Sequence, residues 1–173
     1  QDQFYSAGNL VKFLTDGQIA FHTYCRLIKE AEHEIHILTY ILGDDETGNK
    51  ILELLIKKAQ KGIRVRLLVD ALGSFRRPGK KIRELKQAGG EVCTFMPALP
   101  FQTHGWANLR NHRKIAVFDN KKSILGGRNL DKRFMGETPD QDRFFDFGAV
   151  YEGPIVDCLN GIFLSDWAFA SKQ

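Results

Sequence analysis

The chain has 173 residues, of which 43% are hydrophobic and 27% charged, a composition typical of one soluble globular domain with a buried core. No apolar run approaches the ~18 residues that a membrane-spanning helix needs, and no signal peptide is visible at the start. The three cysteines lie far apart in the sequence, which excludes a disulfide framework and a paired-cysteine metal site.

The formal net charge is +4, but the charge is unevenly distributed. Residues 71–122 hold eleven Lys or Arg against three acids, whereas the rest of the chain holds fourteen against eighteen. Such a segment attracts phosphate, nucleic acid or an acidic membrane surface, although a merely solvated basic face gives the same pattern. The same two interpretations, anionic lipid head groups or solvent, apply to the basic cluster formed by Arg76, Arg77, Lys80, Lys81 and Arg83.

The first half of the chain alternates between helical and strand patterns. A helix is predicted after Asp16, a good N-cap residue, and a second, amphipathic helix over 49–60. Pro78 can open a third helix, which Gly89-Gly90 would end. Strands are predicted between these helices, at 34–40, 63–70 and 91–95.

The second half begins with a long irregular loop over 96–109. Two strands follow, at 111–118 and 121–125, and Asp119-Asn120 between them is a hairpin signal. After another long loop, a strand is predicted at 144–151 and a helix at 154–170. The order of elements predicts an α/β fold with a mixed, largely parallel β-sheet flanked by helices on both faces. Because both long loops flank the hairpin, we expect the working site at that end of the sheet.

The residues with the clearest chemical potential lie on this hairpin. His112 and Lys114 are two positions apart, so on a strand they would share a face, and the returning strand would bring Asn129 beside them. Gly126-Gly127 would let the backbone approach a ligand closely. An ammonium and a carboxamide suit the oxygens of a phosphodiester, and an imidazole can attack phosphorus or protonate the leaving group. With no carboxylate cluster nearby, we expect neither a metal nor another cofactor.

The spacing of these residues resembles the motif of the phospholipase D superfamily. His112-x-Lys114 is followed after four residues by Asp119, and six residues later by Gly126-Gly127-x-Asn129. The segments EIHILTYIL, KGIRVRLLVDALGS and NLRNHRKIAV extend the resemblance, which runs over nearly the whole chain, to the N-terminal half of bacterial cardiolipin synthases.

The resemblance implies a role for each candidate residue. His112 would be the nucleophile or the acid–base partner, and Lys114 and Asn129 would hold the phosphoryl oxygens. Asp119 would mainly hold the turn, and Asp146 would orient the histidine. Many members carry Ser where this chain has Gly127, so one hydroxyl donor is missing. The candidate catalytic residues are therefore His112, Lys114, Asp119, Asn129 and Asp146, and the candidate substrate-binding residues are Lys114, Asn129, Gly126, Gly127 and Arg110.

In that family two such halves form one active site. Residues 1–173 are therefore expected to be a single catalytic half-domain, and since the chain opens on Gln1, to be a piece of a longer protein whose missing part could carry a membrane anchor. The implied reaction is phosphatidyl transfer between two phosphatidylglycerol molecules through a phosphohistidine, on the cytoplasmic side of a membrane. The implied partners are an anionic phospholipid and a second half, from the same polypeptide or from a second copy.

Two other functions stay open from the sequence. The same site would serve a metal-independent phosphodiesterase, nuclease or phospholipase D-type hydrolase that works as a homodimer, and only then would nucleic acid be a partner. The other is a catalytically silent regulatory module. Such a module would have no need to retain His112, Lys114 and Asn129 together, so the complete set argues against it. Structural roles are expected for His22, His33, His36 and Arg113. His104 would line the entrance of the site or lie on the surface. The phenylalanines 134, 144, 145 and 147 are expected in the core, with an acyl-chain groove as the alternative.

Overall fold

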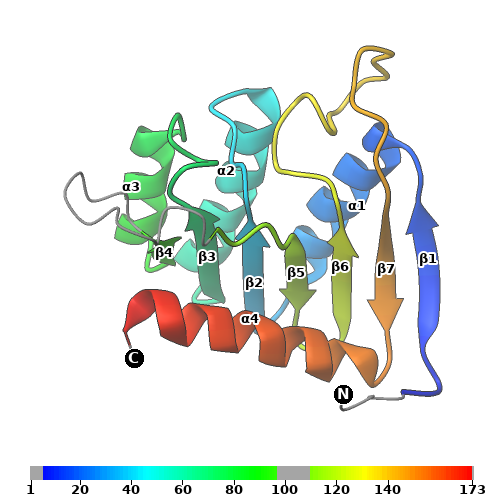
Figure 1. Ribbon diagram of the computed structural model, residues 1–173. Coiled ribbons are helices and arrows are strands. Elements are labelled where there is room, and N and C mark those ends of the chain that lie inside the picture. The colour runs from blue at the N-terminus through cyan, green and yellow to red at the C-terminus, as the bar shows by residue number, and fades with distance from the viewer. Residues whose placement is uncertain (1–5, 97–109, 173) are drawn as a thin grey trace.

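The computed structural model describes residues 6–96 and 110–172. Within these ranges, seven strands form one mixed sheet in the order β1-β7-β6-β5-β2-β3-β4 (Figure 1). The strands are β1 (Leu10–Leu14), β2 (Glu34–Thr39), β3 (Arg64–Asp70), β4 (Glu91–Phe95), β5 (Ile115–Phe118), β6 (Lys122–Gly126) and β7 (Gly148–Glu152). Strands β2, β3 and β4 pair in parallel, and the other four neighbouring pairs are antiparallel. The predicted mixed sheet is confirmed, but the expectation that it is largely parallel is wrong, because the hairpin β5–β6 and its neighbours build most of it from antiparallel pairs.

Helices cover both faces of the sheet, as the sequence predicted. In the described part of the chain they are α1 (Gly17–Glu30), α2 (Glu46–Gln60), α3 (Gly79–Gln87) and α4 (Ile155–Ser171). Figure 1 shows α4 lying across one face of the sheet and α1, α2 and α3 behind the other. No helix in the described ranges is both long and apolar enough to cross a membrane.

Each face of the sheet has its own hydrophobic core. Ile28, Leu55 and Leu67 are fully buried on the side of α1 to α3. On the other side Phe163 of α4 stacks on the ring of His36, with 4.7 Å between the ring centres. His36 also contacts the Asn160 amide oxygen through Nδ1, at 2.8 Å, so its expected structural role is confirmed.

Local sequence signals account for most element ends. The Asp16 carboxylate accepts hydrogen bonds from the N–H groups of the first turn of α1, as predicted for an N-cap. Asp119 and Asn120 both have positive φ, 52° and 51°, which is the backbone of a type I′ hairpin turn. Helix α2 begins at Glu46 rather than 49, since Asp45 caps it through the N–H of Gly48.

Three strand predictions need correction. β1 was not expected and adds to the edge beside β7. β5 begins at Ile115, so His112 and Lys114 precede the strand instead of lying on it. β7 begins at Gly148, and the side chains just before it therefore do not alternate into the core: Phe144, Phe145 and Phe147 are 57%, 97% and 50% exposed. The predicted core role of these three phenylalanines is wrong.

Candidate active site

Most of the predicted site residues gather at one end of the central strands, and Asp119 is the exception. Because β5 and β6 pair in antiparallel register, with Ile115 opposite Leu125, the segment before β5 and the segment after β6 lie at the same edge. β2 also reaches this edge, with Leu38 opposite Ile115, and β3 runs parallel to β2. One volume at the end of the sheet is therefore surrounded by the residues that follow β2, β3 and β6 and by those that precede β5. The sequence predicted the site at this end of the sheet.

His112 and Lys114 contact each other directly. The Lys114 ammonium lies 2.9 Å from Nδ1 of His112 and 2.5 Å from the His112 carbonyl oxygen. The expected meeting of the two side chains is confirmed, but strand alternation does not produce it. The lysine instead folds back on the irregular segment that precedes β5.

The two side chains differ in burial, and their pKa values reflect it. Lys114 is only 3% exposed, and burial lowers the pKa of its ammonium to about 8, opposed by the Asp146 carboxylate. His112 is exposed, yet partial desolvation and then the Lys114 charge lower the pKa of its imidazole, while Asp70 raises it. Near neutral pH the site therefore holds a neutral imidazole beside an ammonium that deprotonates unusually easily.

Tyr40 lies against both of these groups. Its ring centre is 4.5 Å from that of His112, and 5.5 Å from the Lys114 ammonium, which is within range of a cation–π interaction. The residue follows β2 directly. Sequence reasoning missed Tyr40, because a tyrosine at the end of an apolar strand carries no signal of a site.

Asn129 completes the group from the loop after β6. It is buried, and the Ile41 N–H donates to its amide oxygen at 2.9 Å, which turns the NH2 end of the amide away from β2. The backbone beside it is paired in the same way, since the Leu130 N–H donates to the Ile41 carbonyl. Asn129 is thus held as a fixed donor of N–H groups.

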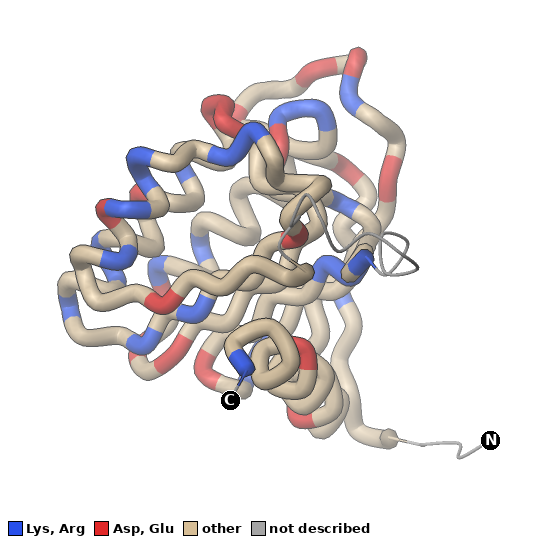
Figure 2. Tube along the Cα trace, turned by 60° about the vertical axis from the view of Figure 1, so that its left-hand side comes forward, with Lys and Arg blue, Asp and Glu red and all other residues tan. Residues whose placement is uncertain are grey.

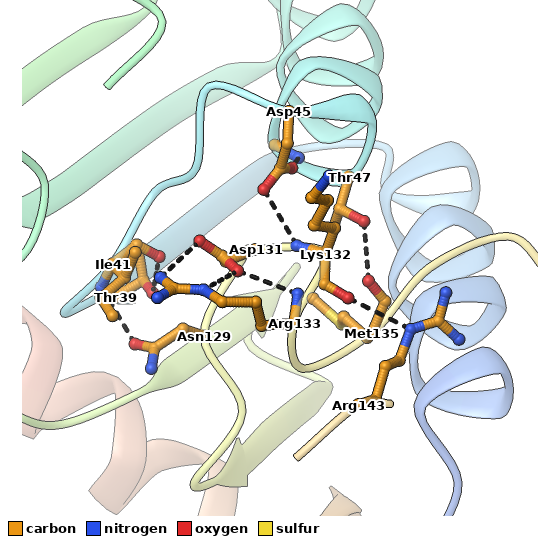
Figure 3. A network of polar contacts seen from close by, with 11 residues as sticks. Thr39, Ile41, Asp45, Thr47, Asn129, Asp131, Lys132, Arg133, Met135 and Arg143 are labelled. Atoms are coloured by element: carbon orange, nitrogen blue, oxygen red, sulfur yellow. Dashed lines mark hydrogen bonds and ion pairs between the residues drawn. The ribbon is translucent and has the colours of Figure 1, made fainter. Parts of the chain in front are cut away.

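A network of polar contacts anchors the rest of this loop, as Figure 3 shows. The Asp131 carboxylate accepts from the Arg133 side chain at 2.8 Å, and the Lys132 N–H donates to Asp45 at the start of α2. The Thr47 hydroxyl donates to the Met135 carbonyl. The loop that carries Asn129 is therefore fixed to α2.

Asp146 lies beside Gly127, in the segment just before β7. Its carboxylate accepts from the Phe147 N–H at 2.6 Å, and a Cβ built on Gly127 would meet one of its oxygens at 2.2 Å. The carboxylate acts on the pKa of Lys114 and is not among the charges that shift that of His112. Asp146 is thus close enough to Lys114 to influence the pKa of its ammonium, and its expected role in orienting His112 stays a prediction.

Gly126 allows the backbones of β6 and β7 to approach closely. A Cβ at this position would meet the Gly148 Cα and the Phe147 carbonyl oxygen, both at 2.5 Å. The close approach expected of this glycine is therefore to the backbone of β7. Beside it, the buried Arg128 donates to the carbonyls of Leu14 and Asp146 and so ties β1 to the start of β7.

Asp119 lies at the opposite end of β5 from His112. Its carboxylate accepts three backbone N–H groups, from Glu32, His33 and Glu34, at 2.7–2.9 Å. These bonds hold the carboxyl pKa below its ordinary value although burial acts against them. Asp119 therefore fastens the connection between α1 and β2 to the hairpin, a structural role, and it does not belong with the catalytic candidates.

Asp70 is a site residue that sequence reasoning missed. It is fully buried at the end of β3, and its carboxylate accepts the N–H of Asn111, the residue before His112, at 3.3 Å. Its other oxygen accepts from Leu72 and Gly73. An acid that ends a buried apolar strand just before a glycine loop was the available signal, because such a carboxylate needs several donors.

The arginines on either side of His112 divide as predicted. Arg113 points away from the site and pairs with Asp166 of α4 at 3.0 Å, so its expected salt bridge is confirmed. Arg110 lies 3.9 Å from the Asp70 carboxylate and donates to the Met96 carbonyl. It is therefore close to the site, where a head-group contact stays a prediction. His104, expected near the entrance, lies outside the described residues.

Comparison with known proteins agrees with this arrangement. The family model described as "Cardiolipin synthase, PLD-like domain" matches residues 24–167. The chain belongs to this family. The resemblance that the motif predicted is thereby confirmed, and the matched range contains every candidate residue of the site.

The curated relatives of this cardiolipin synthase-type domain are longer proteins. The cardiolipin synthase of Halalkalibacterium halodurans is 42% identical over 163 residues, which cover 94% of this chain and 32% of that protein. Cardiolipin synthase A of Pseudomonas entomophila is 32% identical over 167 residues, 96% of this chain and 35% of that protein. The chain thus spans about a third of the length of the relatives that it matches.

Solved structures with low sequence identity share the fold. The phospholipase D family member Nuc from Salmonella typhimurium aligns with a TM-score of 0.66 at 17% identity, covering 92% of this chain and 93% of Nuc. The phosphatidylserine synthase of Haemophilus influenzae aligns with a TM-score of 0.69 at 16% identity, covering 87% of this chain and 35% of that chain. The α/β fold predicted from the sequence is therefore confirmed.

Proposed function

We propose that this domain is one catalytic half of a cardiolipin synthase-like enzyme that transfers a phosphatidyl group between two phosphatidylglycerol molecules. The observation that carries the proposal is the contact of the Lys114 ammonium with the His112 ring beside the buried amide of Asn129. The relatives named as cardiolipin synthases support the choice of substrate.

The proposed reaction is a double displacement through a phosphohistidine. A histidine nitrogen attacks the phosphorus of one phosphatidylglycerol, the bond from phosphorus to the glycerol oxygen breaks, and glycerol leaves after taking a proton. A hydroxyl oxygen of the second phosphatidylglycerol then attacks the phosphorus of the phosphohistidine and gives up its proton. The bond from phosphorus to the histidine nitrogen breaks, and cardiolipin leaves. His112 is the nucleophile or the proton-transfer partner, and the histidine of a second half takes the other role.

Lys114 and Asn129 are suited to hold the phosphoryl oxygens during both steps. An ammonium supplies a positive charge to the non-bridging oxygens, and the amide NH2 supplies neutral donors whose position is fixed by the Ile41 bond. Because both side chains are buried, these interactions act where water competes little.

The contact between Lys114 and Nδ1 also bears on which ring nitrogen attacks. While the ammonium donates to Nδ1, a neutral His112 ring must carry its proton on Nε2. A bound phosphoryl group attracts the ammonium, and Nδ1 is then free to take the ring proton. We infer that attack comes from Nε2 and that substrate binding itself selects the reactive tautomer.

The enzyme that this proposal describes works on an anionic lipid at the cytoplasmic side of a membrane, with its second half supplied by the same polypeptide or by another copy. The test uses the natural protein that contains this chain, in vesicles of phosphatidylglycerol, with a His112→Asn variant as control and products identified by mass. Cardiolipin and free glycerol, both lost in the variant, are the expected result.

Other products would separate the alternatives. Phosphatidic acid without cardiolipin would mean that water is the acceptor and that the enzyme is a hydrolase. Cleavage of DNA in the presence of a chelator, with no lipid turnover, would favour the homodimeric nuclease. That result would overturn the lipid substrate and leave the phosphodiester site in place.

A further inference from the structure

The loop between β3 and α3 exposes large apolar side chains next to the site. Leu72 is 56% exposed and Phe75 is 81% exposed, although both follow a strand whose other apolar residues are buried. A highly exposed phenylalanine is an unusual feature of a protein surface in water, since burying such a ring is favourable. An exposed apolar pair of this kind is typical of a surface that binds another molecule.

The loop is held in this position by hydrogen bonds. The Asp70 carboxylate accepts the N–H of Leu72 at 2.8 Å and that of Gly73 at 3.1 Å. The Ser74 hydroxyl donates to the Tyr40 carbonyl and accepts the Leu42 N–H. Gly73 packs so tightly that a Cβ would meet the Tyr40 carbonyl oxygen at 2.3 Å. The exposure of the apolar pair is therefore a fixed property of the loop.

The charged side chains of the segment that carries this apolar pair are all basic. Residues 71–83 contain five Lys or Arg and no acid. Lys81 is paired with Glu53 at 2.8 Å, and the remaining four surround the loop and the first turns of α3: Arg76, Arg77, Lys80 and Arg83. Figure 2 shows lysines and arginines spread along the side of the molecule that carries α3.

We propose that this loop docks the domain on an anionic lipid bilayer, with Phe75 and Leu72 in the interfacial layer and the basic side chains against the head-group phosphates. Phe and Leu side chains of peripheral proteins insert at the boundary of head groups and acyl chains, and Lys and Arg are attracted to an anionic lipid surface. The inference rests on the proposed function, because it names how a substrate that is part of a bilayer reaches the site.

The position of the loop explains why docking would serve catalysis. Asp70, at its root, binds both the loop and the residue before His112, and Tyr40 binds the loop and lies against His112. A bilayer seated on Phe75 would therefore bring lipid phosphates to the level of the imidazole.

The other exposed aromatic residues fit an anionic bilayer less well. Phe144 and Phe145 follow a segment that contains Asp140 and Asp142, and Asp146 comes directly after them. Carboxylates at these positions would be repelled by anionic head groups. The β3–α3 loop combines apolar exposure with positive charge.

The first test measures insertion of the loop. The natural protein carrying Phe75→Trp is mixed with phosphatidylglycerol vesicles that contain brominated lipid, and quenching is compared with that of the parent protein. We expect added quenching and a blue shift with phosphatidylglycerol but not with phosphatidylcholine. Phe169→Trp, in an α4 residue 57% exposed, serves as the matched control and should show neither.

The second test measures binding. Phe75→Ser should weaken partition into phosphatidylglycerol vesicles about tenfold, and Phe169→Ser should not. Replacing Arg76 and Lys80 together by Gln should also weaken partition, by an amount that disappears in high salt.

Two outcomes would overturn the proposal. One is the absence of added quenching with phosphatidylglycerol. The other is an introduced indole at position 75 that is already blue-shifted without vesicles and unchanged by them, because a protein segment would then cover the loop. Measuring cardiolipin on the same vesicles separates the two proposals: product without quenching sinks only the docking, and quenching without product sinks only the transferase.

Discussion

The Lys114 ammonium, in a side chain that is 3% exposed, lies 2.9 Å from Nδ1 of the exposed His112 ring. This contact joins the solvent-accessible nucleophile candidate to a cation whose pKa burial lowers to about 8. Lys114 therefore changes its protonation state close to the pH range in which most enzymes work. The pH dependence of the reaction should report that change.

We expect kcat/KM to fall above pH 8, by about tenfold for each pH unit, because Lys114 loses its proton there and no longer attracts the phosphoryl oxygens. On the acid side, activity should fall only below the ordinary histidine pKa of about 6.5, since the pKa of His112 is lowered. The measurement is a pH profile on phosphatidylglycerol, whose diester does not titrate in this range.

Lys114→Arg is the matched variant for the alkaline limb. A guanidinium keeps its charge throughout, so the variant should be less active at pH 7 but should show no decline near pH 8. An unchanged alkaline limb in the variant would mean that another group causes it.

Gly126 and Gly127 are adjacent, but alanine should act differently at the two positions. At Gly126 the new methyl would press on the backbone of β7, and we expect a loss of about 2–3 kcal/mol in the free energy of unfolding. At Gly127 it meets only the end of the Asp146 side chain, which can move. Urea unfolding of the two variants checks this difference.

Gly127→Ala should also alter the pH profile. Moving the Asp146 carboxylate away removes a charge that raises the pKa of Lys114, so the alkaline limb should shift to lower pH. A variant with an unshifted limb would show that Asp146 has no influence on the lysine.

Asp119→Asn should destabilise the domain by about 2–3 kcal/mol at pH 7, because a charged acceptor of three backbone N–H groups is lost. Since the folded pKa is depressed, this stabilisation is present above the unfolded value of about 3.9 and is lost as the pH falls through the folded value. Unfolding measured at pH 7 and at pH 3 should therefore give a difference between parent and variant that shrinks at low pH. A loss of similar size at both values would argue against the depressed pKa.

Asp70→Asn tests whether Asp70 positions His112 or only stabilises the loop. Because the carboxylate raises the pKa of His112, the variant should have a lower imidazole pKa, measured by NMR titration, together with a reduced kcat. Ser74→Ala removes other hydrogen bonds of the same loop without changing any charge, and it should leave that pKa in place. An equal effect of both variants on the His112 titration would make the role of Asp70 purely structural.

Much of the fold was predictable because it depends on neighbours in the sequence. The N-cap at Asp16, the hairpin turn at Asp119 and the spacing of apolar residues act over one turn or one strand, and all three were confirmed. The fixed spacing of His112, Lys114 and Asn129 pointed to the family for the same reason, and the family model confirmed it.

Other features depend on contacts between distant segments. β1 pairs with β7, which lies at the other end of the chain, so its short sequence alone carried no strand signal. β7 begins at Gly148 because its pairing with β6 begins there, opposite Gly126. Three phenylalanines before this point are therefore left exposed.

The sequence by itself thus determined the family, the α/β class and the candidate residues of the site, His112, Lys114 and Asn129, since these are encoded in residue type and spacing. Only the tertiary structure decided that Lys114 folds onto His112, that Asp70 and Tyr40 join them, and that Asp119 lies at the far end of its strand. Those outcomes depend on which strand ends meet at one edge of the sheet, and that meeting is fixed by long-range pairing rather than by any local pattern.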